Sequence, residues 1–113
     1  MFLGARGAAL VDLVVEAREG GHHSGNWGGL LANPGIQLAH AIASIVGPKG
    51  EIRVPALVPK GGIPDNVRVA LADCALEPGP NDPKIDHDWG EPGLTAPEKV
   101  YGWCNFEVLA FEA

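Results

Sequence analysis

The stretch HHSGNWGGLLANPGIQLAHAIASIVGP, residues 22–48, contains the clearest structural signal in the sequence. Asn33 can accept a hydrogen bond from an amide at the start of a helix, and Pro34 suits the first helical position. Gly47 and Pro48 then supply a stop. Between these signals, apolar residues recur at three- and four-residue spacing, which predicts an amphipathic helix packed on a sheet. The apolar stripe consists of Leu38, Ala39, Ile42, Ile45 and Val46.

Three short segments around this helix predict β-strands. Residues 9–17 alternate, with aliphatic side chains on one face and the carboxylates of Asp12 and Glu16 on the other. Residues 51–54 alternate in the same way before a proline that removes the next backbone donor. Residues 105–111 form a third alternating segment at the end of the chain. We therefore expect strands before the helix, directly after it, and at the C-terminal end.

The part of the chain at about residues 55–99 predicts a Pro/Gly-rich excursion without a long regular element. Eight of the ten prolines lie between Pro55 and Pro97, and proline interrupts both helices and strands. Apolar residues at helical spacing after Pro64 predict a short helix, and residues 97–101 predict one more helical turn.

The order strand, helix, strand, excursion, strand predicts an α+β fold. We expect residues 1–113 to form a single, partial domain: a two-layer, ferredoxin-like sandwich with an antiparallel sheet and helices on one face. Such a layer normally continues into a second helix and a returning strand. The sequence instead ends at Ala113 in strand-like sequence, so we expect the domain to be truncated at its C-terminus.

Composition and charge argue against several classes of partner. The net charge is −6 with only eight Lys and Arg residues, so no basic surface for nucleic acid is expected. The apolar start of the chain is interrupted by Arg6 and Asp12, well short of the ~20 residues that span a bilayer. Cys74 and Cys104 lack CxxC spacing, which argues against a zinc ribbon or a redox pair. We expect a cytoplasmic protein with free thiols.

A family resemblance rests on the residues that lead into the helix. An aliphatic segment introduced by GARG is followed by His-Ser-Gly, then Trp-Gly-Gly, and then Asn-Pro at the helix start. This order resembles the lid (dimerisation) domain of the zinc metallopeptidases that include carnosinase, acetylornithine deacetylase and succinyl-diaminopimelate desuccinylase. The matching positions are residues 4–7, 23–25, 27–29 and 33–34, followed by GEIRVP at residues 50–55.

The resemblance implies a role for the glycine-rich loop in hydrolysis of dipeptides or N-acyl amino acids. In that family the lid forms a homodimer, through a sheet edge and a helix, and sends a histidine across the interface to the substrate carbonyl or oxyanion. His23 is the matching residue. The neighbouring substrate-binding candidates are Ser24, Gly25, Gly28 and Gly29.

The metal chemistry of that family is expected outside this chain. The resemblance implies a missing catalytic domain of the same enzyme with two zinc ions and a glutamate general base. That domain carries an HxD motif and an adjacent Glu-Glu pair, and neither occurs in this sequence. We therefore predict no metal ligand and no hydrolysis by this chain alone.

Three alternatives stay open at this point. His22 could take the role of His23 if the register of the match is shifted by one residue. The chain could instead be a self-standing, homo-oligomerising interaction module without a catalytic role. A small mononuclear metal protein could use His22, His23 and the cluster Asp86, His87 and Asp88, although consecutive residues point in different directions and a solvated loop is the simpler interpretation.

Overall fold

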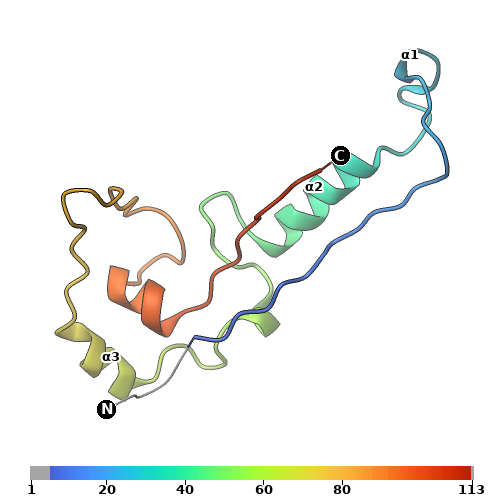
Figure 1. Cartoon of the computed structure of the whole chain (residues 1–113). Coiled ribbons are helices and arrows are strands. Elements are labelled where there is room, and N and C mark those ends of the chain that lie inside the picture. Colours follow the sequence, from blue (N-terminus) through green and yellow to red (C-terminus); the bar gives the residue numbers. More distant parts are fainter. Residues whose placement is uncertain (1–5, 113) are drawn as a thin grey trace. The chain divides into compact units, whose positions relative to one another are not determined.

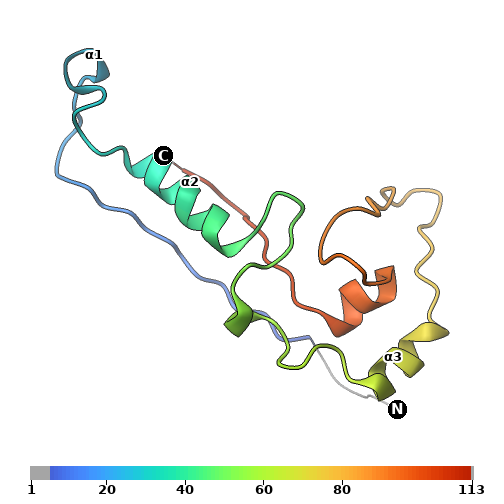
Figure 2. The same ribbon diagram turned by 180° about the vertical axis from the view of Figure 1, so that it is seen from behind.

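The computed structural model describes residues 6–112, which divide into two units. The first unit contains the described residues up to Ala43 and from Val108 onward, and the second contains Ser44–Glu107. Gly4 and Ala5, which begin the GARG match, lie outside the described residues. Figures 1 and 2 show the elements in chain order: α1 (Ser24–Trp27), α2 (Pro34–Ile45), the 3₁₀ helix η1 (Pro55–Leu57), α3 (Asp65–Ala72) and the π-helix η2 (Glu98–Gly102).

The predicted α+β, ferredoxin-like sandwich is wrong. Residues 6–112 contain no strand, and the β-type pairing within them is one isolated antiparallel bridge between Val46 and Ile52. The alternating segments at residues 9–17 and 105–111 run without regular secondary structure. Alternation specifies which face of a segment is apolar, but a strand also needs a neighbour for its N–H and C=O groups. The sequence pattern contained no information on that neighbour.

Helix α2 is confirmed where the sequence predicts it. The Asn33 side-chain oxygen accepts a hydrogen bond from the Ile36 amide at 3.1 Å, and Pro34 is the first helical residue. The apolar stripe is only partly covered, since Leu38 and Ile42 are half-buried. The prediction that this stripe packs on a sheet is wrong, because the described residues form no sheet.

A tight turn follows α2 and replaces the strand predicted at residues 51–54. The Gly47 amide donates to the Glu51 carbonyl at 2.8 Å, and the Arg53 amide donates to the Ile45 carbonyl at 2.8 Å. Gly50 adopts a φ of +81° at the tip of this turn, which is a conformation that favours glycine. The predicted strand is thereby reduced to the single bridge at Ile52.

The excursion contains a small packed region built from α3 and η2. The helix predicted after Pro64 is confirmed as α3, and the helical turn predicted near residue 97 is confirmed as η2. The Ile63 side chain is buried, with 5% of its surface exposed, and it lies against Gly102 of η2.

A buried carboxylate holds this region together. Glu98 is 7% exposed, and its carboxylate accepts hydrogen bonds from the Thr95 amide at 2.9 Å and from Arg68 at 3.0 Å. The Thr95 hydroxyl lies 3.4 Å from the Glu98 amide, completing the reciprocal pair of a capping box. Because Arg68 belongs to α3, Glu98 links the two helices.

Candidate functional site

His23 occupies the capping position of the one-turn helix α1. Its Nδ1 accepts a hydrogen bond from the Gly25 amide at 3.0 Å. Its carbonyl oxygen accepts hydrogen bonds from the Asn26 amide at 3.1 Å and the Trp27 amide at 3.2 Å. Its backbone is extended, with φ −66° and ψ 121°, as expected for a residue that precedes a helix. His23 is thus held by its own loop rather than by a distant element.

The capping bond fixes the chemistry of the imidazole. A nitrogen that accepts a hydrogen bond carries no proton, so the neutral His23 ring has its proton on Nε2. The side chain is exposed. His23 therefore offers an Nε2–H donor to a ligand while Nδ1 holds the ring in one orientation.

Two of the predicted glycines make this arrangement sterically possible. A Cβ atom at Gly25 would lie 2.8 Å from Cε1 and 2.9 Å from Nδ1 of His23, so any larger residue would displace the ring from this position. A Cβ atom at Gly28 would lie 2.6 Å from the Ser24 carbonyl oxygen. Gly29 has a φ of +80°, in the left-handed region. The loop is thus shaped by its glycines, as the sequence indicates.

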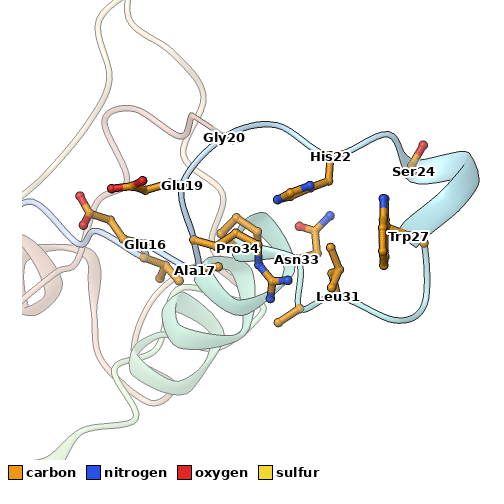
Figure 3. Close-up of a pocket in the computed structure, with 14 residues that line it drawn as sticks. Glu16, Ala17, Glu19, Gly20, His22, Ser24, Trp27, Leu31, Asn33 and Pro34 are labelled. Carbon is orange, nitrogen blue, oxygen red and sulfur yellow. The ribbon is translucent and has the colours of Figure 1, made fainter.

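An open hollow of about 800 Å³ lies beside this loop in the first unit (Figure 3). Of the predicted site residues, Ser24 and Gly28 line the hollow, whereas His23, Gly25 and Gly29 are not among its lining residues. The lining residues are Val15, Glu16, Ala17, Arg18, Glu19, Gly20, His22, Ser24, Trp27, Gly28, Leu31, Ala32, Asn33 and Pro34. Residues 15–20 also line the hollow and have no regular secondary structure, although the sequence predicted that residues 15–17 belong to a strand.

His22, rather than His23, lies in the hollow. Its ring stands edge-on to Trp27, with ring centroids 6.5 Å apart and planes inclined by 69°. In Figure 3 the His22 and Trp27 rings border the same space as Asn33 at the start of α2. The two adjacent histidines are thus separated in role: one caps α1, and the other lines the hollow.

The acidic cluster near residue 87 is engaged by two lysines. Asp88 pairs with Lys49 at 2.5 Å, and Lys99 donates to the carbonyls of His87 at 3.2 Å and Trp89 at 2.6 Å. The hydrogen bond and charge of Lys49 hold the pKa of Asp88 below its ordinary 3.8. The same contact raises the pKa of Lys49 above 10.5. These contacts anchor a loop.

The described part of the chain does not fit a metal centre. Within residues 6–112, no group of three or more His, Cys, Asp or Glu side chains is arranged to hold a metal ion. The mononuclear metal interpretation, with His22, His23 and the cluster Asp86, His87 and Asp88, gains no support from these residues.

Comparisons with known proteins identify no family. No family model, no curated protein and no solved structure matches the chain. A separate finding concerns membranes: none of the helices among residues 6–112 has the length and apolar character needed to cross a bilayer.

Proposed function

We propose that this chain is the dimer-forming, histidine-bearing lid of a zinc-dependent hydrolase that cleaves amide bonds in dipeptides or N-acyl amino acids. The supporting observation is the geometry of His23, which is exposed and held through Nδ1 with its donor on Nε2. A lid histidine that stabilises an oxyanion requires such a donor. The choice of this enzyme family rests on the resemblance of the sequence around His23 to the lid motif. It does not rest on a ferredoxin-like fold, which the described residues do not form.

In this proposal His23 acts on the substrate bound to the partner subunit. Its Nε2–H donates to the carbonyl oxygen as negative charge develops there. One donor of this kind typically contributes about 10²–10³ in rate, because it is oriented before the reaction begins. Ser24, Gly25, Gly28 and Gly29 let the loop approach the substrate closely. The proposal assigns the two zinc ions and the general base to a separate catalytic domain of the same enzyme.

The proposal also includes a cytoplasmic location. Cys74 and Cys104 are both unpaired and exposed, and exposed thiols persist in a reducing compartment.

The catalytic role is tested by three substitutions in the enzyme that contains this lid. His23→Ala removes both the cap of α1 and the Nε2 donor, whereas His23→Asp keeps a good capping oxygen and has no side-chain N–H donor. We expect kcat to fall about 10²–10³-fold in both variants, with unchanged zinc content. His22→Ala, at the adjacent position, should leave kcat nearly unchanged. Full activity of His23→Asp would reduce His23 to a structural cap.

A second function is favoured by the exposure of apolar side chains. In the first unit, Leu10, Leu30 and Ile36 are each at least 60% exposed, and extensive exposed apolar surface is typical of protein–protein contact sites. A self-standing homo-oligomerising interaction module would cover them by association. The coding sequence on both sides discriminates the two: an upstream HxD motif supports the hydrolase, and its absence supports the module.

A further inference from the structure

The segment at residues 9–17 presents apolar side chains and an unpaired backbone at the same time. Leu10 is 82% exposed, Val11 72%, Val14 70% and Leu13 46%. Within the part of the chain that the structure describes, none of residues 9–17 takes part in a backbone hydrogen bond. An extended segment in this condition is a template for pairing with another chain.

The sequence of this segment is complementary to itself around Leu13. When two copies run antiparallel with Leu13 opposite Leu13, each Val11 faces Val15 and each Ala9 faces Ala17. Directly opposed residues of an antiparallel pair lie on the same face. One face of the ribbon therefore consists only of Ala, Val and Leu.

The charges select this register over its neighbours. With Leu13 at the centre, Asp12 faces Val14 and Glu16 faces Leu10, so no two carboxylates are directly opposed. If the twofold axis lay at Asp12, the two Asp12 carboxylates would face each other. If it lay at Val14, Asp12 would face Glu16. A slip of one residue in the pairing brings carboxylates onto the apolar face. A parallel in-register pair would oppose each carboxylate to its own copy.

We infer that two copies of this chain associate through residues 9–17, paired antiparallel about a twofold axis at Leu13. The inference rests on the homodimer of the proposed function and holds whether or not His23 is catalytic. A twofold contact of this kind closes on itself, so it gives a dimer rather than a filament. A two-stranded ribbon alone is marginal in water, and exposed apolar residues of the same unit, such as Ile36, would add to the contact.

Two lysine substitutions test the register in the full 113-residue chain. Leu13→Lys places two ammonium groups opposite each other and removes two leucine side chains from the apolar face, so we expect it to raise the dimer Kd at least about tenfold. Leu10→Lys is the matched control, since its ammonium group faces Glu16 twice per dimer and should leave the Kd unchanged or lower it. Sedimentation equilibrium measures the Kd, and circular dichroism verifies equal helix content. Equal effects of both substitutions would overturn the register.

Cysteine cross-linking provides a second readout. In a Cys74→Ser, Cys104→Ser background, Leu13→Cys brings two thiols to opposed positions about 4.5–5.5 Å apart at Cα, within the range of a disulfide. Asp12→Cys faces Val14 instead. We expect oxidised dimer from Leu13→Cys and little from Asp12→Cys. If the wild-type chain is a dimer but Leu13→Lys leaves its Kd unchanged and Leu13→Cys forms no disulfide, the pairing through residues 9–17 is wrong and the proposed homodimer stands. If the wild-type chain is a monomer, the proposed homodimer is wrong as well.

Discussion

Replacement of Glu98 by alanine should loosen the packed region of α3 and η2. The Glu98 carboxylate is nearly inaccessible and accepts hydrogen bonds from Thr95 and Arg68, which come from different parts of the second unit. Alanine removes both acceptors. The Thr95 amide then loses its partner beside a buried position, and α3 loses its polar link to η2.

The size of the effect follows from these contacts. Loss of a capping interaction typically costs about 0.5–2 kcal/mol. The pair with Arg68 adds about 0.5–1 kcal/mol, because the Arg68 side chain is 45% exposed and remains solvated without its partner. The total of about 1–3 kcal/mol corresponds to a fall of about 5- to 150-fold in the protection of amides in α3 and η2 against hydrogen exchange.

Hydrogen exchange followed by NMR on the full chain measures this fall directly. Glu98→Gln should show a smaller effect, since its amide oxygen can still accept one of the two bonds. Glu77→Ala is a suitable control, because Glu77 is exposed and outside the helices. Protection of α3 and η2 within twofold of wild type in Glu98→Ala would refute the role assigned to the carboxylate.

Three further predictions concern the loop, α2 and the lysine pair. Gly25→Ala should displace the His23 ring and lower kcat of the assembled enzyme, and a wild-type kcat would contradict the packing at this glycine. Asn33→Ala should destabilise α2 by about 1 kcal/mol, measurable as reduced helicity by circular dichroism. The Lys49–Asp88 pair should stabilise the turn after α2 fully between pH 3.8 and 10.5, because the pKa of Asp88 is lowered and that of Lys49 is raised. This stabilisation is lost as the pH falls further below 3.8 or rises further above 10.5. An NMR titration in which the Asp88 carboxyl titrates at or above 3.8 would contradict this.

Local signals in the sequence predicted α2, α3 and η2, whereas the short helices α1 and η1 were not predicted. The start of α2 depends on Asn33 and Pro34, which act within one turn of the backbone, and the structure realises both. The position of α3 after Pro64 follows from the same kind of signal. Such signals suffice because a helix satisfies its own backbone hydrogen bonds.

The predicted strands failed because their partners are not encoded locally. Residues 9–17 have the alternation of a strand, yet the described chain provides no neighbour for their backbone. The hollow was missed because it depends on the path of an irregular segment. Glu16 and Glu19 line it from this segment, and no local sequence pattern specifies such a path. The capping box of Thr95 and Glu98 could have been found, because the pattern T-x-x-E stands in the sequence.

Subunit complementation in the proposed hydrolase tests most directly whether His23 acts across the proposed dimer. One variant carries His23→Ala, and the other lacks a zinc ligand of the catalytic domain but retains His23; each homodimer alone should be nearly inactive. After subunit exchange, half of the dimers are mixed and hold one complete site each, so we predict recovery of about a quarter of wild-type activity. An exchanged mixture that stays as inactive as its two parents would contradict the account.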